Sequence, residues 1–404
     1  MDRPISARRR RIVAGLGLGL AAGIAPIRIA EGASERSLRG TGDLGIVVER
    51  ASGSVLIVDQ SEYAAIGRVE GLGDLSHASA VFSPDQRYAF IFGRDGGLSK
   101  IDILAQNLAA RVQQAGNSIG GAISDDGTLV AVSNYEPGGV RVFDAETLVL
   151  IADIPAEWPG GLSKTVGLVD APGRRFVFSL WDAGETWIAD FSQGEVPRMT
   201  RISGIGANPY DALITGDGRR YIAGLFGEDG LTALDLWQNP PTPRKILAGY
   251  GRGEEKLPVY KMPHLEGWAL AGDRFALPAI GRHEILWVDA ASLSEIGRTA
   301  THGQPVFAVA RPDGRQVWVN FAHPLNDTLQ VIDSPSGEIV ATLTPGPATL
   351  HMEFTPRGHE LWVSVRDAGR IDIYDTATFA KKAEIAAQDP SGIFFTARAH
   401  RIGL

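Results

Sequence analysis

The chain has 404 residues, of which 44% are hydrophobic and 21% charged, a balance that supports a packed core and argues against global disorder. The formal net charge is -8, and beyond the arginine-rich first 30 residues the chain carries 33 basic and 46 acidic residues. This acidic balance argues against a nucleic-acid partner, which would require a basic surface. The chain has no cysteine, which excludes disulfides, thiolate metal sites, haem attachment through CxxCH and a lipid-anchored cysteine.

The N-terminal segment has the features of an export signal. Four consecutive arginines at residues 8–11 precede a mildly apolar run rich in Gly and Ala at residues 12–25. We expect residues 1–33 to be a twin-arginine-like signal peptide, cleaved between about Ala30 and Ser34, that directs the protein to the periplasm. The run is too short and too weakly apolar for a stable membrane span, and an uncleaved anchor is the alternative.

One strand pattern recurs from about residue 43 to the C-terminus. An alternating apolar strand leads into a Pro/Asp/Gly turn and an aromatic or β-branched second strand; a third strand ending in Asp and a more polar fourth strand follow. The turn and second strand read SPDQRYAFIF (83–92), SDDGTLVAVS (124–133), APGRRFVFSL (171–180), TGDGRRYIAG (215–224), AGDRFALPA (271–279), RPDGRQVWVN (311–320) and TPRGHELWVS (355–364).

The spacing of this unit predicts the fold. Four short strands about every 40 to 46 residues are typical of a β-propeller. Seven units are complete, and an eighth at residues 45–70 has three strands; the apolar segment GIFFTARA at 392–399 can supply its missing strand. The sequence therefore predicts an all-β, eight-bladed propeller over residues 43–404, closed by pairing of the N- and C-terminal strands, which removes exposed sheet edges. Seven blades is the alternative count.

Blade topology predicts which residues share a face. In an up-and-down blade, the connections between blades and the loops joining second and third strands open on the same side of the ring. Six of the eight histidines and three arginines fall on those segments. Before or at first strands lie His77, His264, His302 and His351, and on the loops after second strands lie Arg94, Tyr135, Arg282, His283, His323 and Arg366.

These residue types suggest a ligand. Imidazole can ligate iron or exchange protons near neutral pH, and arginine binds carboxylates through two parallel hydrogen bonds. A carboxylate-bearing tetrapyrrole in a central cavity needs both groups. Each residue also has a structural alternative, such as a surface ion pair for Arg94 or simple packing for Tyr135. Asp211 is either a proton-transfer residue or a turn cap, with the cap favoured. Strand positions place three tryptophans in the core between blades: Trp287, Trp318 and Trp362.

Three segments resemble a known family: DLSHASAVFSPDQRYAFIFGRD (74–95), GGVRVFDAETLVLIADIPA (138–156) and PSGIFFTARAHRI (390–402). They are similar to the d1 domain of cytochrome cd1 nitrite reductases, an eight-bladed propeller that holds haem d1 in its central cavity. The resemblance covers nearly the whole chain after residue 43. This chain differs in having no cysteine and no c-haem domain. In that respect it resembles the family's exported single-domain members, which are required for haem d1 biosynthesis.

The resemblance implies roles for individual residues. His77 matches the proximal iron ligand, and Arg94 matches an arginine of the haem-facing loop. His264, in PHLEGW, resembles a segment with one of two distal histidines, and His302, in ATHGQP, lies near the second in a shifted match. Tyr135, Arg282 and Arg366 join the cofactor-binding set because of their place on the shared face of the predicted propeller, not because of the resemblance.

The function implied is binding of haem d1 or its iron-containing late precursor, non-covalently, followed by modification of the macrocycle's side chains. In this hypothesis His77 ligates the iron, His264 with His302 transfers protons, and the arginines clamp carboxylates. A non-catalytic carrier that hands haem d1 to apo-nitrite reductase or other haem d1 assembly proteins is the first alternative. A propeller scaffold for protein partners, which binds no tetrapyrrole, is the second.

Overall fold

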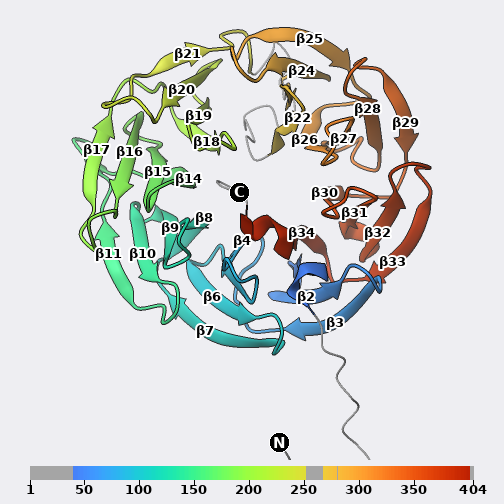
Figure 1. Ribbon diagram of the computed structural model, residues 1–404, viewed down its shortest axis with the longest axis horizontal. Coiled ribbons are helices and arrows are strands. Elements are labelled where there is room, and N and C mark those ends of the chain that lie inside the picture. Colours follow the sequence, from blue (N-terminus) through green and yellow to red (C-terminus); the bar gives the residue numbers. More distant parts are fainter. Residues whose placement is uncertain (1–39, 252–266, 280, 401–404) are drawn as a thin grey trace, which may run out of the picture. The chain divides into compact units, whose positions relative to one another are not determined.

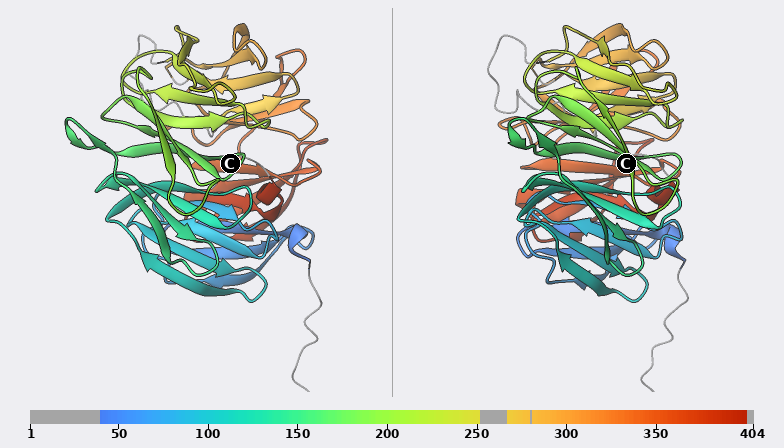
Figure 2. Two further views of the ribbon diagram at one scale, coloured as in Figure 1. Left: turned by 60° about the vertical axis from the view of Figure 1, so that its left-hand side comes forward. Right: turned by 90° about the vertical axis from the view of Figure 1, so that its left-hand side faces the viewer.

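The structure, a computed structural model, describes residues 40–251, 267–279 and 281–400. Within these ranges, 32 strands form eight four-stranded antiparallel sheets, which Figure 1 shows as the blades of a ring with the first strand of each blade innermost. Figure 2 shows the ring from the side, with the strands running between its two faces. The predicted all-β, eight-bladed propeller is confirmed, and the seven-bladed alternative is wrong. The expected signal peptide lies outside the described residues, and in the described ranges no helix has the length and apolar character to cross a membrane.

The first four blades follow the chain from its N-terminal side. Blade 1 comprises β34 (Pro390–Phe395), β1 (Leu44–Glu49), β2 (Ser54–Asp59) and β3 (Ala64–Val69). Blade 2 comprises β4 (Ser79–Phe82), β5 (Tyr88–Phe92), β6 (Gly97–Asp102) and β7 (Asn107–Gln113). Blade 3 comprises β8 (Asn117–Ile123), β9 (Leu129–Glu136), β10 (Val140–Asp144) and β11 (Leu150–Ile154). Blade 4 comprises β14 (Thr165–Ala171), β15 (Arg175–Leu180), β16 (Glu185–Asp190) and β17 (Arg198–Ile202).

The other four blades complete the ring. Blade 5 comprises β18 (Pro209–Ile214), β19 (Arg220–Leu225), β20 (Leu231–Asp235) and β21 (Arg244–Ile246), and blade 6 comprises β22 (Ala269–Ala271), β23 (Arg274–Pro278), β24 (Glu284–Asp289) and β25 (Glu295–Ala300). Blade 7 comprises β26 (Pro305–Ala310), β27 (Gln316–Phe321), β28 (Leu329–Asp333) and β29 (Ile339–Leu343), and blade 8 comprises β30 (Thr349–Phe354), β31 (Glu360–Val365), β32 (Arg370–Asp375) and β33 (Lys381–Ala386). Outside the blades lie the hairpin β12 (Glu157–Trp158) and β13 (Gly161–Leu162) and the short 3₁₀ helices η1 (Thr41–Asp43), η3 (Arg366–Ala368) and η4 (Thr396–His400).

The ring closes in blade 1, where the C-terminal strand β34 pairs with β1. Gly45 faces Phe395 in this ladder, and a Cβ on Gly45 would lie 2.5 Å from the phenyl ring, so this position requires glycine. Phe395 also packs edge-on against Trp362 of blade 8, with ring centroids 5.3 Å apart. The predicted closing strand is thus confirmed, but it ends at Phe395. There the Thr396 hydroxyl donates to the Leu44 carbonyl at 3.1 Å and the chain turns into η4.

Side chains in the turns explain the two sequence signals of the repeat. At the hairpin after a first strand, the Ser83 hydroxyl accepts the Tyr88 N–H at 2.9 Å. At the end of a third strand, the Asp144 carboxylate accepts the Thr147 N–H at 2.8 Å. Such short polar side chains satisfy backbone donors where the chain reverses and the ladder stops. The recurring Ser/Thr and Asp positions therefore mark strand ends.

The core lies between neighbouring blades, as the three tryptophans predict. Trp287, Trp318 and Trp362 are buried. Trp318 of blade 7 packs against Phe354 and Phe379 of blade 8, with ring centroids 6.4 and 5.8 Å apart. Each blade therefore depends on its neighbours for the burial of its apolar faces.

Because Phe395 is only 1% exposed and joins blades 1 and 8, we expect Phe395→Ala to lower the free energy of unfolding by about 3–5 kcal/mol. Urea denaturation followed by tryptophan fluorescence measures this loss. Val196 is 88% exposed, so Val196→Ala is the control and should change stability by less than about 0.5 kcal/mol. Equal stability of the two variants would show that β34 does not hold the ring closed.

Candidate functional site

A cavity of about 930 Å³ occupies the centre of the ring, and all eight blades contribute residues to its wall. It extends from the loops that follow the second strands, represented by Arg50 and Arg366, to the hairpins on the other face, represented by Gly216 and Pro312. This volume lies in the range of about 300–1,000 Å³ that is usual for small-molecule sites. The cavity is therefore the candidate ligand site.

β-Bulges direct several side chains into this cavity. In blades 4, 5, 7 and 8 the pairing of the first strand with the second shifts register near its start, for example between Pro209 and Ala212 and between Thr349 and Met352. An inserted residue turns side chains away from the strict alternation of a regular strand. The residues inside these register shifts that line the cavity include Tyr210, Asp211, Val306, Phe307, Leu350 and His351.

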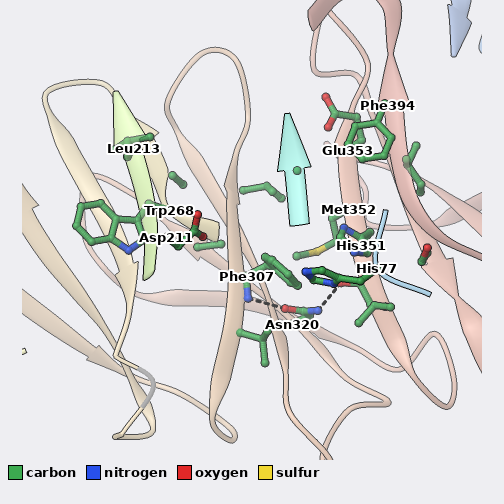
Figure 3. Close-up of a pocket in the computed structure, with 18 of the residues that line it drawn as sticks. His77, Asp211, Leu213, Trp268, Phe307, Asn320, His351, Met352, Glu353 and Phe394 are labelled. Atoms are coloured by element: carbon green, nitrogen blue, oxygen red, sulfur yellow. Dashed lines mark hydrogen bonds between the residues drawn. The ribbon is translucent and has the colours of Figure 1, made fainter. Parts of the chain in front are cut away.

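The Asn320 side chain forms hydrogen bonds to two of these bulges. Its side-chain oxygen accepts the Phe307 N–H at 2.8 Å, and its amide nitrogen donates to the carbonyls of Thr349, at 3.3 Å, and Leu350 (Figure 3). One buried amide thus joins the inner strands of blades 7 and 8. The His351 imidazole stacks at the same place on the Phe307 ring, with centroids 5.1 Å apart.

His77 lies in the connection that enters blade 2, and its exposed side chain faces the cavity. The surrounding protein partly desolvates the imidazole and so lowers the pKa of His77. The positive charges of Arg94 and Arg50 lower that pKa further. The imidazole is therefore neutral at neutral pH. Neutral imidazole is the form that can ligate a metal ion.

Arg94 and Tyr135 are not among the cavity-lining residues of the described ranges, but they contact each other and, through Tyr135, a residue that lines the cavity. The Arg94 guanidinium lies over the Tyr135 ring at 5.2 Å, and the Tyr135 hydroxyl donates to the Tyr210 hydroxyl at 3.3 Å. Tyr210, which does line the cavity, packs edge-on against Trp181 at 5.5 Å. Burial raises the pKa of both tyrosines, so both phenols stay protonated. Tyr135 lies within β9, not in the loop after it as predicted.

The structure brings together only part of the predicted set. His77 and Arg366 line the cavity, as do His323 and His351. Arg282 and His302 are exposed and are not among the cavity-lining residues of the described ranges. His264 lies outside the described residues.

Arg282 and His302 each contact another residue of the chain. The Arg282 guanidinium lies 4.0 Å from the Glu284 carboxylate, and the His302 ring packs edge-on against Phe321 at 5.7 Å. The sequence favoured a turn cap for Asp211, but this residue lies in the bulge of β18 and lines the cavity.

Three cavity arginines, Arg50, Arg311 and Arg398, were missed by the sequence reasoning. Arg50 lies in the turn between β1 and β2, the place that Arg94 occupies in blade 2. The incomplete first unit hid this equivalence, although the segment ERASGS between two apolar strands carried the signal. Arg398 comes from η4, where it lies 3.4 Å from Glu353 and over the Phe394 ring.

The cavity wall carries charged and apolar side chains on both sides. Blades 1, 2 and 8 contribute Arg50, His77 and Arg366 together with apolar residues, and blades 5 and 6, across the ring, contribute Trp268 and the Asp211 carboxylate, which Figure 3 shows near one another. Leu270 is 49% exposed although it is apolar. A cavity lined by cations and by apolar surface suits a ligand with a flat hydrophobic body and a charged periphery.

Comparison with known proteins gives one consistent family. Residues 39–399 match the model of the family described as Cytochrome D1 heme domain. Curated proteins named NirF from Stutzerimonas stutzeri and Pseudomonas aeruginosa are 58% and 59% identical; the alignments cover 94% and 91% of this chain and 98% and 94% of the relatives. A solved structure of the dihydro-haem d1 dehydrogenase NirN in complex with DHE is 26% identical with a TM-score of 0.80, over 90% of this chain and 78% of the other.

The lowered pKa of His77 predicts a pH dependence. In the unfolded chain this residue titrates near its ordinary value of 6.5, so below that pH the unfolded state binds more protons than the folded state. Stability should therefore fall as the pH drops from about 7.5 to about 5.5, and His77→Gln should reduce this slope. Urea denaturation across that range measures the slope.

NMR titration of the His77 ring is the direct check. The imidazole should titrate below 6.5, and Arg94→Gln should raise its pKa because one neighbouring positive charge is removed. An unshifted His77 in the wild-type protein would contradict the electrostatic account.

Proposed function

Because this chain belongs to the cytochrome d1 haem domain family, we propose that its central cavity binds haem d1 or an iron-containing late precursor as a non-covalent substrate. Relatives named NirF, and a solved relative that is a dihydro-haem d1 dehydrogenase, support a role in haem d1 biosynthesis or binding. The observation that carries the proposal is the central cavity, whose wall combines neutral His77 with arginines and with apolar side chains.

In this proposal the residues around the cavity have different roles. His77 is the ligand for the iron, and Arg366 binds a carboxylate at the edge of the macrocycle. Trp268 and Leu270 pack on the macrocycle, while Arg94 and Tyr135, with its bond to Tyr210, stiffen the wall beside His77. The bound tetrapyrrole supplies the redox chemistry, and the protein supplies binding, orientation and protons.

The enzymatic form of the proposal adds modification of the macrocycle's side chains. That chemistry requires a group that moves protons at the periphery. His264 and His302 are the candidates from the sequence, although His302 does not line the cavity, and the cavity adds His351, which packs against Phe307. We also propose that the protein acts in the periplasm after removal of residues 1–33, and that apo-nitrite reductase or other haem d1 assembly proteins are its partners.

The iron-ligand role predicts that His77→Ala weakens binding of haem d1 by at least about tenfold and shifts its Soret band, because the iron would lose a protein ligand. Absorbance titration of the purified variant with haem d1 extracted from a cytochrome cd1 nitrite reductase measures both changes. His359, exposed on the other rim between β30 and β31, provides the control His359→Ala, which should bind like the wild type. An unchanged spectrum and affinity for His77→Ala would overturn the assignment.

Turnover separates the enzyme from the carrier. An enzyme should convert isolated precursor into a product of different mass, and Ala variants of the proton-transfer candidates should slow the conversion by about 10²-fold or more without an equal loss of binding. Mass spectrometry of the extracted tetrapyrrole follows the reaction. A carrier should return its ligand unchanged but transfer it to apo-nitrite reductase.

A further inference from the structure

Asn320 lies opposite the β-bulge in the innermost strand of blade 7. The register shift between Pro305 and Ala308 places two residues, Val306 and Phe307, opposite this single residue of β27. A bulge of this kind interrupts the ladder and leaves backbone groups without their usual partners. The Asn320 side-chain oxygen accepts the Phe307 N–H at 2.8 Å, so the side chain replaces a bond that the ladder does not make there.

Blade 8 repeats this arrangement with a serine. Its register shift places Leu350 and His351 opposite Ser364, whose hydroxyl accepts the His351 N–H at 2.8 Å. His351 is therefore the counterpart of Phe307 in the neighbouring blade. The two rings stack with centroids 5.1 Å apart and an angle of 33° between their planes.

Asn320 also reaches across to blade 8, as Figure 3 shows. Its amide nitrogen donates to the carbonyls of Thr349, at 3.3 Å, and Leu350. The Leu350 carbonyl belongs to the same peptide group as the His351 N–H, so this peptide is held on one side by Asn320 and on the other by the serine hydroxyl. Asn320 thus fixes both the backbone from which His351 enters the cavity and the backbone of the ring on which the imidazole stacks.

The burial and bonding of Asn320 suit it to position other residues. The residue is 1% exposed, so it offers almost no surface to a ligand. Its oxygen accepts one hydrogen bond and its nitrogen donates two, which uses both N–H groups of the amide. A carboxylate has no N–H to donate, and a serine hydroxyl has one hydrogen on a shorter side chain, so neither group can make all three bonds.

We propose that Asn320 is a positioning residue for proton transfer by His351. This inference rests on the enzymatic form of the proposed function. The step is the transfer of one proton between the imidazole and a side chain of the bound macrocycle, and no electron moves in it. Its rate depends on where the imidazole lies, and a displacement of about 1 Å can lower such a rate by about 100-fold. Affinity depends on the whole cavity wall and should change little.

The test uses two substitutions of Asn320. Asn320→Ala removes all three hydrogen bonds. Asn320→Ser copies the arrangement of blade 8, because a serine can accept the Phe307 N–H but does not reach the carbonyls of the next blade. His351→Ala and the double variant Asn320→Ala/His351→Ala complete a cycle that shows whether the two residues act together.

Asn134 provides the matched control Asn134→Ala. It is also 1% exposed and lies in β9, the second strand of blade 3, where its side chain bonds to Gln114. It is not among the cavity-lining residues of the described ranges. Asn134→Ala therefore also removes a buried amide but leaves the bulges of blades 7 and 8 unchanged. Thermal unfolding verifies that each variant is folded, and Asn320→Ser carries the test if Asn320→Ala does not fold.

The first measurement needs no ligand. NMR spectra of protein with ¹³C-labelled histidine report the His351 ring, whose signals are displaced by the ring current of Phe307. Both Asn320 variants should move these signals towards those of an unstacked histidine, and Asn134→Ala should leave them in place. Unchanged His351 signals in both Asn320 variants would overturn the positioning role, whatever the protein does to a tetrapyrrole.

The second measurement is turnover of, and affinity for, an isolated iron-containing late precursor of haem d1. Both Asn320 variants should convert it about 10- to 100-fold more slowly and bind it within about threefold of the wild type, and Asn134→Ala should match the wild type. The double variant should be no slower than His351→Ala alone, because Asn320 acts through His351.

The outcomes separate this inference from the proposed function. Wild-type turnover in both Asn320 variants, or a double variant slowed by the product of the two single losses, overturns the positioning role and leaves the enzyme standing. A wild type that binds the precursor without converting it overturns the enzymatic form together with this inference and supports a carrier. A wild type that does not bind the precursor overturns the proposed function itself.

Discussion

Pairing of β34 with β1 is the interaction on which the rest of this structure depends. Blades bury their apolar faces on one another, so the ring holds its central cavity only when blade 1 also meets blade 8. The same strand contributes Ile393 and Phe394 to the cavity wall and fixes the turn that carries Arg50. Closure of the ring therefore also completes the wall of the site, and a ligand bound in the cavity should stabilise the closed ring.

The wall of the cavity is shaped by departures from regular strand geometry. Register shifts in the inner strands turn Tyr210, Phe307 and His351 inward, and Asn320 ties two of these bulges together across blades 7 and 8. In a regular strand only every second side chain would point into the cavity, so fewer kinds of side chain would line it. The bulges thus give the propeller a site without changing its core.

The cavity wall at blades 1, 2 and 8 concentrates positive charge. Burial lowers the pKa of both His77 and Arg50. The charges of Arg94 and Arg50 lower the pKa of His77 further, and the charge of Arg366 lowers that of Arg50 further. Burial and this repulsion together keep the imidazole neutral and available to a metal, and the repulsion favours a ligand that carries carboxylates. Stability given up by the free protein is available as binding energy, in keeping with the proposed tetrapyrrole ligand.

The sequence by itself determined the number of blades, the closing strand and the inter-blade tryptophans, because turn residues and period-two alternation are local signals. It also placed His77 and Arg366 on the correct face. Only the tertiary structure decided that Arg282 and His302 lie off the cavity wall, that Arg94 and Tyr135 reach it through Tyr210, and that Arg50 lines it. How far a side chain lies from the axis of the propeller depends on β-bulges and on the ion pairs that the side chain forms. The spacing of a sequence repeat predicts neither.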